Sequence, residues 1–371
     1  MKIPLARPYI TKSIYQEIRN LIQTGFLTEG NYTKKFERLL EEYIGCKDCI
    51  AFTSATTALE AVIKSLNLKK NDEIIAPNFS YPATISPAIL YNHKIKLIDV
   101  NKYDYNLCFD ELSKNISTKT KVVIPVSVFG NSLNYDKLLK LKKKYGFVII
   151  EDAAAALGTT YKKKKIGNIA DYTIFSFHPR KSITTGEGGV VASNHTKKIE
   201  WLRMFKNFGL KKEGKSIFKI SGTNLKMSNI NALFGINQIK IFDKILKKKH
   251  NIVQNYKNEL SKHENIQIQE VTKNSKHSYQ TFCITLNNRD QAMKYLRSKG
   301  IEAQIGYYAL NQHNAFKKNK NVKVCRNLNN SVFLAQHTLA LPLYYQMTSN
   351  EQSYVLEIFN KFLSLKKNEK K

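Results

Sequence analysis

The sequence predicts an α/β fold, with a three-layer large domain around a mostly parallel sheet and a smaller C-terminal α+β domain. Short apolar strands alternate with amphipathic helices through about residue 200, as in a parallel sheet covered by helices. Residues 122–129 form an apolar run rich in β-branched side chains, as expected for a strand buried on both faces. A lysine run at 247–249 marks a change in composition. We therefore expect the large domain to cover residues 1–248 and the small domain residues 249–371.

The composition indicates a folded chain with a strongly basic surface. Of its 371 residues, 42% are hydrophobic, which suffices for a sizeable core and excludes a disordered protein. The 60 lysines and arginines exceed the 29 acidic residues, giving a formal net charge of +31. No nucleic-acid-binding motif accompanies the lysine runs, which lie at 140–144, 162–165, 247–249 and 366–371. We interpret the charge as a solvated surface that favours anionic substrates and expect no nucleic-acid partner. A non-enzymatic protein that binds nucleic acid or a membrane surface is the alternative.

The cysteines and the N-terminus suggest a cytoplasmic protein without a membrane span. The five cysteines are an odd number, and residues 1–14 lack the apolar core of a secretory signal. Reduced thiols are therefore expected. Cys46 and Cys49 form a single CxxC motif without a second pair or a histidine pair, so we expect no metal site. No run of residues approaches the roughly 18 consecutive apolar positions of a membrane helix.

Two helices are predicted in the N-terminal part of the chain. Apolar residues at helical spacing predict the first over residues 10–23, and Gly25 ends it. A loop at 26–31 leads into the second helix, at 33–43, whose apolar side chains share one face. Both helices are therefore expected to pack one face against a core.

A third helix follows the first predicted strand. Residues 49–52 form this strand, and a turn that begins Ser54, Ala55, Thr56 leads into an apolar helix at 58–66. Small hydroxyl residues between a strand and a helix make a ready anion site, because free N–H groups and the positive end of the helix dipole meet there. An ordinary Ser/Thr N-cap is the alternative interpretation.

Strands and helices continue to alternate toward the middle of the chain. Strands are expected at 73–77, 94–100, 122–129 and 147–150, with one helix ending at Tyr91 and another at 135–145. Tyr81 follows the first of these strands, and Glu151 and Asp152 follow the last. A carboxylate directly after a buried strand needs a cation or hydrogen-bond donors. Asp152 is therefore expected to be either the partner of a ligand cation or a helix N-cap.

Residues 174–189, IFSFHPRKSITTGEGG, place one lysine in a tight turn at a strand end. Pro179 lacks a backbone N–H, so the strand is expected to stop there. Gly186 and Gly188 permit positive φ and close backbone approach, so the loop around Lys181 can fold tightly. Ligand sites of α/β proteins lie at such strand ends. A surface loop in a lysine-rich protein is the alternative.

The pattern changes to that of a smaller domain after about residue 250. Before the change, helices are expected at 197–208 and within 224–246. After it, the expected elements are a strand at 279–286, a helix at 290–299, a strand at 303–305 and a terminal helix at 350–365. The sequence contains no internal repeat.

Lys181, Asp152, the Ser54 turn and Tyr81 each follow a separate strand of one predicted α/β domain. Because the carboxyl ends of parallel strands converge, these groups can share one cleft. An amine, a carboxylate, an anion-binding helix start and an aromatic ring are what pyridoxal phosphate requires. A nucleotide phosphate site competes with this interpretation, but the chain has neither GxxxxGK[ST] nor a GxGxxG after a strand.

Longer motifs extend this pattern over nearly the whole chain. PLARPYI opens it, GFLTEG starts at Gly25, SATTAL at Ser54 and PNFSYPAT at Pro77. EDAA starts at Glu151, and the most specific motif, FSFHPRKSITTGEGG, starts at Phe175. Together they resemble the DegT/DnrJ/EryC1/StrS family of sugar aminotransferases, which are fold type I pyridoxal-phosphate enzymes.

The resemblance implies a pyridoxal 5′-phosphate site shared between two subunits. It gives Lys181 the Schiff-base role, Asp152 the contact to the pyridinium nitrogen and Tyr81 the stacking on the ring. Phosphate contacts are implied for Ser54, Ala55, Thr56 and Ser176. Residues 222–238 resemble a family motif in which an asparagine of the partner subunit reaches the phosphate. That residue is Asn224 here, so a homodimer is expected.

The chain departs from the family pattern at three positions. Ala155 stands where a Gln or His near the cofactor is usual, and Lys226 replaces an arginine. Residues 306–310 resemble a region near the sugar substrate, but the histidine expected soon after is Asn311. The expected substrate contacts are Thr28, Tyr308 and His313.

The resemblance implies a ping-pong transamination. An amino acid, commonly L-glutamate, would donate its amino group, and a nucleotide-linked keto-sugar such as a 4-keto-6-deoxyhexose would receive it. Lys181 would move the proton as general base and acid. Such products serve amino-sugar and surface polysaccharide synthesis, including O-antigen. Another fold type I enzyme, such as a desulfurase using Cys325 as nucleophile, is the alternative.

Overall fold

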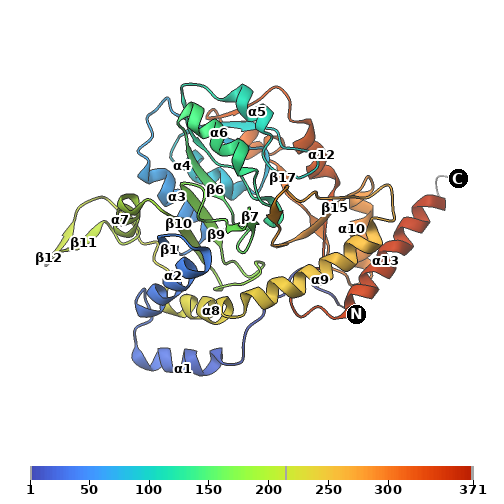
Figure 1. Cartoon of the computed structure of the whole chain (residues 1–371), viewed down its shortest axis with the longest axis horizontal. Helices are drawn as coiled ribbons and strands as arrows, with labels where there is room; N and C mark the ends of the chain where they lie inside the picture. The colour runs from blue at the N-terminus through green and yellow to red at the C-terminus, as the bar shows by residue number, and fades with distance from the viewer. Residues whose placement is uncertain (1, 214, 369–371) are drawn as a thin grey trace.

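The computed structural model describes residues 2–213 and 215–368, so the last part of the 366–371 lysine run lies outside the described residues. Figure 1 shows a large body of strands and helices that continues into a smaller C-terminal part. At the centre is an eight-stranded sheet, whose order is β1-β10-β9-β6-β5-β2-β4-β18. In that order the strands span Asp48–Phe52, Gly189–Ser193, Tyr172–Ser176, Val148–Asp152, Thr120–Val123, Glu73–Pro77, Lys94–Ile98 and Val322–Val324.

The central sheet is mostly parallel, as predicted. Strand β10 is antiparallel to both of its neighbours, β1 and β9. The remaining pairs are all parallel. The strands that precede the predicted site residues therefore run in one direction and present their carboxyl ends at one edge.

Helices cover both faces of the sheet, which makes the three layers expected from the sequence. Successive strand residues face opposite cores: Ile149 and Phe175 contact one, Ile150 and Ile174 the other. The first core is closed by α2 (Asn31–Ile44), α5 (Phe109–Asn115), α6 (Tyr135–Tyr145) and α8 (Asn229–Ile239). The second is closed by α3 (Ala55–Ser65), α4 (Ser86–Leu90) and α7 (Thr196–Phe205). The short helix α1 (Ile14–Thr24) packs on α8 and ends at Gly25, whose φ of 70° is left-handed.

The prediction of one strand over residues 122–129 was wrong. Strand β5 ends at Val123, and a 3₁₀ turn, η2, follows at Val128–Gly130. Pro125 cannot donate a ladder hydrogen bond, and Phe129 has a left-handed φ of 58°. The segment is nevertheless apolar because it is buried: Val126 and Phe129 pack against Cys283 and Ala340 of the C-terminal part.

The C-terminal part has its own antiparallel sheet, in the order β13-β15-β19-β16. Its strands are β13 (Gln267–Ile268), β15 (Phe282–Thr285), β19 (Thr338–Leu341) and β16 (Gln304–Ile305). A core between this sheet and α9 (Phe242–Leu260), α10 (Arg289–Ser298) and α13 (Ser349–Asn368) also includes Ile3. Residue 248, the boundary expected between the two domains, lies inside the continuous helix α9.

Short segments late in the chain return to the large body, which the sequence did not predict. Strand β17 (Tyr308–Ala309) pairs with β3 (Phe79–Ser80), and β18 forms an edge of the central sheet. Between and beside them lie the turns η1 (Pro82–Thr84) and η3 (Leu310–Gln312) and the helices α11 (Asn314–Lys317) and α12 (Asn329–His337). The β17–β3 pairing brings the C-terminal part to the strand edge where the predicted site lies.

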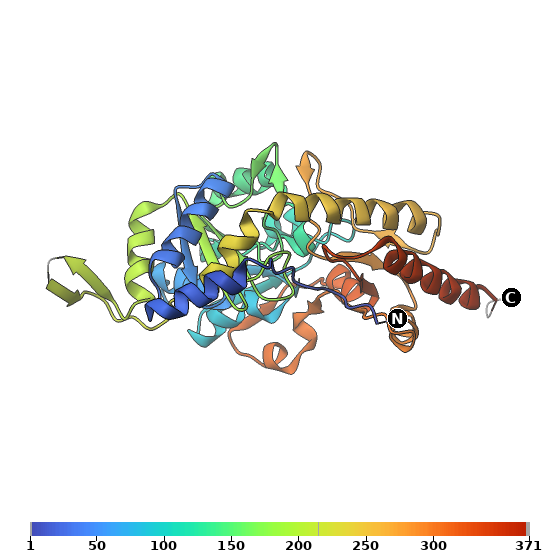
Figure 2. The same cartoon turned by 90° about the horizontal axis from the view of Figure 1, so that it is seen from below.

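Two small sheets complete the fold. One combines β7 (Thr160–Tyr161), β8 (Lys164–Lys165) and β14 (Ser275–Lys276). The other is a hairpin of β11 (Leu210–Glu213) and β12 (Lys215–Phe218). In Figure 2 this hairpin projects from one end of the molecule, and α13 leads to the C-terminus at the opposite end. Phe208, Ile217 and Phe218 on this projection are exposed.

Candidate active site

The predicted site residues lie at the carboxyl ends of neighbouring strands. Asp152 is the last residue of β6, Ser176 is the last of β9, and the Ser54 turn follows β1. These three strands run in the same direction, with β10 between β1 and β9. The sheet therefore brings the three features to one edge.

The Ser54 turn is both a helix cap and a source of free N–H groups. Ser54 Oγ accepts a hydrogen bond from the Thr57 N–H at 3.1 Å, and Thr57 Oγ1 accepts one from the Ser54 N–H at 3.0 Å. This reciprocal capping box starts α3 at Ala55, three residues before the predicted start. The N–H groups of Ala55 and Thr56, in the first helical turn, have no acceptor within the helix. The N-cap and anion-site interpretations are therefore compatible.

Gly189 joins the Ser54 turn to Ser176. In the sheet register, Gly189 stands opposite Phe52 on one side and Ser176 on the other. A Cβ added to Gly189 would lie 2.2 Å from the Ala55 nitrogen and 2.3 Å from the Ser54 carbonyl carbon. Only glycine permits this approach, so the turn and Ser176 are neighbours across a single residue.

Asp152 is held by hydrogen bonds at both carboxylate oxygens. Thr84 Oγ1 donates to Oδ2 at 2.7 Å, and the Ala154 N–H donates to Oδ1 at 3.2 Å. The Thr84 hydroxyl also lies 2.6 Å from Ser80 Oγ. The interpretation of Asp152 as a helix N-cap was wrong, because residues 153–158 form turns rather than a helix. Sequence reasoning missed Thr84, although it lies in the PNFSYPAT motif.

Glu151 points to the opposite side of β6 from Asp152. Its buried carboxylate accepts hydrogen bonds from Ser127 Oγ at 2.6 Å and from the Tyr135 hydroxyl at 2.7 Å. Burial raises the pKa of Glu151 to about 7, although these hydrogen bonds oppose the shift. The two adjacent carboxylates therefore have different environments, and only Asp152 lies at the strand edge.

Lys181 lies in a compact loop between β9 and β10. Its N–H donates to the His178 carbonyl at 2.8 Å, and the loop closes where the Thr185 N–H donates to the Phe177 carbonyl at 3.0 Å. Gly186 has the left-handed φ of 81° that this turn requires. Burial lowers the pKa of the Lys181 amine, and the Asp152 carboxylate opposes that shift. A lowered pKa increases the share of neutral, nucleophilic amine.

Three predicted residues form a row of rings beside this edge. The rings of Tyr81 and Tyr308 are 6.3 Å apart, and those of Tyr308 and His313 are 5.3 Å apart and nearly perpendicular. The β17–β3 pairing places Tyr308 opposite Ser80, next to Tyr81. Tyr81 is 56% exposed, so its ring is free to contact a ligand.

Asn311, which replaces an expected histidine, has a structural partner. Asn78 Nδ2 donates to Asn311 Oδ1, and the Asn311 N–H donates to Asn78 Oδ1, both at 2.9 Å. Asn78 is fully buried, so this reciprocal pair joins η3 to the end of β2. Ala155 is also buried and offers no side-chain hydrogen bond where the family has Gln or His. Sequence reasoning missed Tyr307, a buried residue whose pKa is raised by burial and by the charge of Asp152.

Thr28 and Asn224 are exposed in this chain, and no recorded side-chain contact within 2–213 and 215–368 joins either to Lys181 or Asp152. The Thr28 loop is fixed by Asn229, whose N–H donates to the Leu27 carbonyl at 3.0 Å. Next to Asn224, the Leu225 carbonyl accepts a hydrogen bond from the Thr53 N–H at 3.1 Å. The segment of Asn224 therefore runs beside the end of β1.

Cys325, the alternative nucleophile, lies at the far end of this edge, because β18 is separated from β6 by β5, β2 and β4. Its N–H donates to the Leu97 carbonyl at 2.9 Å, directly after β18 at the border of the sheet. Burial raises the pKa of its thiol, which disfavours the reactive thiolate. The structure therefore gives no support to a desulfurase site at Cys325.

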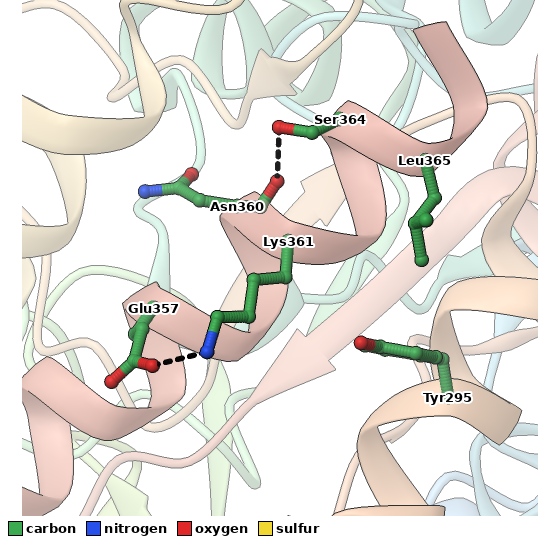
Figure 3. A pocket seen from close by; sticks show the side chains of 6 residues that line it. All are labelled: Tyr295, Glu357, Asn360, Lys361, Ser364 and Leu365. Carbon is green, nitrogen blue, oxygen red and sulfur yellow. Dashed lines mark hydrogen bonds and ion pairs between the residues drawn. The ribbon is translucent and has the colours of Figure 1, made fainter. Parts of the chain in front are cut away.

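A surface hollow of about 600 Å³ lies between α10 and α13, two helices of the C-terminal part. Figure 3 shows its lining, which includes the Glu357–Lys361 ion pair and Tyr295. No predicted site residue lines it. Among residues 2–213 and 215–368, no three His, Cys, Asp or Glu side chains are placed to hold a metal ion. No helix of that described part is both long and apolar enough to cross a membrane.

Comparisons with known proteins find relatives along nearly the whole chain. The family model of the DegT/DnrJ/EryC1/StrS aminotransferases matches residues 8–360. The UDP-4-amino-4,6-dideoxy-N-acetyl-beta-L-altrosamine transaminase of Campylobacter jejuni is 30% identical over 93% of each chain. The GDP-perosamine synthase of Caulobacter vibrioides is 28% identical over 83% of this chain and 85% of its own. A putative sugar aminotransferase from Streptococcus pneumoniae, solved in its PMP form, superposes with a TM-score of 0.92 at 26% identity. That match covers 99% of this chain and 100% of the solved one.

Proposed function

The chain belongs to the DegT/DnrJ/EryC1/StrS aminotransferase family, and on this premise we propose that it is a pyridoxal-phosphate-dependent nucleotide-sugar aminotransferase. It would move an amino group from an amino acid, L-glutamate, to a keto group of a nucleotide-linked sugar for amino-sugar synthesis. The observation that carries the proposal is the convergence of Lys181, Asp152 and the Ser54 turn at one edge of the sheet.

The residues at this edge fit pyridoxal phosphate. The close approach of Gly189 to Ala55 leaves the free N–H groups of the Ser54 turn beside Ser176, which suits a phosphate. The residues that would hold the phosphate are Ser54, Ala55, Thr56 and Ser176. Asp152 would face the ring nitrogen, Tyr81 would lie against the ring, and Lys181 would bind the cofactor covalently. When bound, pyridoxal phosphate supplies an electron sink for the substrate carbon.

The chain's own groups supply the proton transfer and the charge. Burial lowers the pKa of the Lys181 amine, which favours the neutral form that can accept a proton from the substrate carbon and return it. The donors Thr84 Oγ1 and Ala154 N–H orient the Asp152 carboxylate, which would accept a hydrogen bond from a protonated ring nitrogen. The fixed geometry of β6 and of the Lys181 loop preorganises both groups.

The substrate would enter beside the ring row Tyr81–Tyr308–His313. Aromatic and imidazole rings can stack on the base or the sugar of a nucleotide sugar. Tyr81 follows Ser80 in the chain, and Ser80 is hydrogen-bonded to Thr84, which donates to Asp152. Relatives named for UDP-linked and GDP-linked amino sugars support this substrate class. The formal charge of +31 favours the approach of a dianionic nucleotide.

The direct test is turnover with cofactor, L-glutamate and a panel of nucleotide keto-sugars, followed as release of 2-oxoglutarate. We expect release with at least one sugar, and none from Lys181→Ala. Lys163→Ala, an exposed lysine in the turn between β7 and β8, is the matched control and should retain activity. Release from no sugar of the panel would contradict the proposed function.

We further propose a homodimer in which Asn224 of each subunit completes the site of the other. Exposed apolar side chains on two segments support an interface: Tyr15, Ile22 and Phe26 around α1, and Phe208, Ile217 and Phe218 at the hairpin. Mixing unfolded Asn224→Ala and Lys181→Ala chains and refolding them together tests this. Hybrid dimers would contain one intact site, so activity should rise above that of either variant. No rise would contradict a shared site.

We also infer that the enzyme works in the cytoplasm. All five cysteines are free thiols, including Cys46 and Cys49, whose Sγ atoms are 3.6 Å apart without a disulfide. Free thiols at this distance fit a reducing compartment. Fractionation of cells that express the chain tests the assignment, and recovery with membranes or outside the cell would contradict it.

A further inference from the structure

A buried lysine, Lys249 of α9, lies against the loop that carries Lys181. Its side chain is 3% exposed, and its Nζ donates to Ser182 Oγ at 2.9 Å and to the Gln280 carbonyl at 3.1 Å. Within the described residues, no carboxylate forms a recorded ion pair with it. Burying an amine without a carboxylate partner costs free energy, so the buried position of Lys249 needs an explanation.

The two hydrogen bonds join the neighbours of Lys181 to the C-terminal part. Ser182, the next residue after Lys181, donates in turn to Gln280 Oε1 at 3.2 Å. On the other side, Gln280 Nε2 donates to the Arg180 carbonyl. Gln280 therefore contacts the residues before and after Lys181, and Lys249 fixes Gln280 and Ser182 together.

The chemistry of the Lys249 amine matches this arrangement. Burial lowers its pKa to about 7, so a large share is neutral at physiological pH. A neutral amine retains two N–H donors, and the structure gives it two acceptors, Ser182 Oγ and the Gln280 carbonyl. A purely packing role would be met at lower cost by a methionine of similar length.

We propose that Lys249 is a positioning residue, which holds the backbone on both sides of Lys181 against Gln280 and so sets where the Lys181 amine lies. The inference rests on the proposed role of Lys181. Arg180 Nη1 adds a parallel contact to Gln304 Oε1 of β16 at 3.1 Å, so the same loop is tied to the C-terminal sheet at a second point.

The test measures Lys181 without any turnover. The cofactor-free full chain is treated with limiting acetic anhydride over a series of pH values, and acetylation of Lys181 is quantified by mass spectrometry. Lys249→Met should change the acetylation rate of Lys181 by about threefold or more. Lys257→Met is the matched control on the same helix. Lys257 Nζ bonds the Tyr279 hydroxyl at 2.9 Å rather than the loop, so this variant should leave Lys181 unchanged.

Ser182→Ala removes the acceptor of the Lys249–Ser182 hydrogen bond. It therefore provides a second test if Lys249→Met does not fold. Both substitutions should alter Lys181 labelling alike, and the double variant should add nothing to either. In the loaded enzyme, kcat should fall about tenfold with little change in KM for L-glutamate. Unchanged Lys181 labelling in a folded variant, or additive effects, would overturn the proposal. If the enzyme fails to bind cofactor or to transaminate, that result contradicts the proposed function but not the role of Lys249, because the labelling requires neither cofactor nor turnover.

Discussion

The cofactor side of the candidate site (the Ser54 turn, Asp152, Ser176 and Lys181) and its substrate side (Tyr308, Asn311 and His313) are built differently. The cofactor side sits on the ends of parallel strands of the large sheet, and each of its residues lies in a contiguous motif. The substrate side is brought to that edge by a two-residue strand, β17, late in the chain. The large sheet thus positions the residues predicted to bind the cofactor, while short segments late in the chain position those predicted to contact the substrate.

The largest expected effect is on the cofactor side, at Gly189. Gly189→Ala places a Cβ 2.2 Å from the Ala55 nitrogen, so β10 or the Ser54 turn must shift. We expect loss of cofactor binding and a free energy of unfolding lowered by about 3 kcal/mol, measured by absorbance titration and thermal unfolding. Gly146→Ala, which meets no atom within 4 Å but keeps a left-handed φ, is the control and should cost about 1 kcal/mol. Equal effects of the two substitutions would contradict the requirement for glycine at position 189.

Asp152→Asn should affect the reaction without unfolding the chain. The amide keeps the size of the carboxylate but not its charge, so kcat should fall about a hundredfold or more. Thr84→Val removes one donor to Asp152 and should cost about tenfold. Steady-state kinetics with L-glutamate measure both. Wild-type kcat in Asp152→Asn would show that this carboxylate does not serve the cofactor.

Substitutions on the substrate side should change sugar binding without changing cofactor binding. Tyr308→Ala removes a ring that contacts both Tyr81 and His313, so KM for the nucleotide sugar should rise several-fold. The absorbance of the bound cofactor and KM for L-glutamate should not change. If the cofactor spectrum changes as strongly as the sugar KM, the two sides are not separable at this residue.

The smallest effect on the reaction is expected at Glu151, beneath the edge, where the change concerns the pH dependence of stability. Its folded pKa of about 7 lies above the usual value of 4.5. Between these two pH values, Glu151 is protonated in the folded state and ionised in the unfolded state. The contribution to stability is full below about pH 4.5 and is lost as pH rises toward 7. Glu151→Gln should therefore flatten the fall in stability over that window, by up to about 3 kcal/mol, in urea unfolding at several pH values. An unchanged pH dependence would contradict the assignment.

The sequence predicted some element bounds closely and missed others: β9 ends at Ser176, three residues before Pro179, and β5 ends at Val123. Helix α6 begins and ends at the expected residues, Tyr135 and Tyr145, and β2 covers the expected 73–77. The family and its fold were also predicted and are confirmed by the match over residues 8–360. The roles of Lys181, Asp152 and the residues around them remain predictions for the experiments above.

Tertiary burial explains the features that the sequence could not give. Residues 122–129 are apolar because the C-terminal part covers them, and an apolar run alone does not distinguish that from a strand. Strands β17 and β18 are too short to carry a periodic pattern. The lysine run 247–249, interpreted as a domain boundary, lies within α9 and includes both exposed lysines and the buried Lys249. Side-chain charge alone does not reveal which lysine faces inward.

The most direct test of the account is to locate the cofactor on the chain. The protein is incubated with pyridoxal phosphate, reduced with borohydride to fix any lysine adduct, and digested for peptide mapping by mass spectrometry. The account predicts a pyridoxyl phosphate group on Lys181 and on no other lysine in significant amount. A group fixed chiefly on another lysine, or on none, would contradict it.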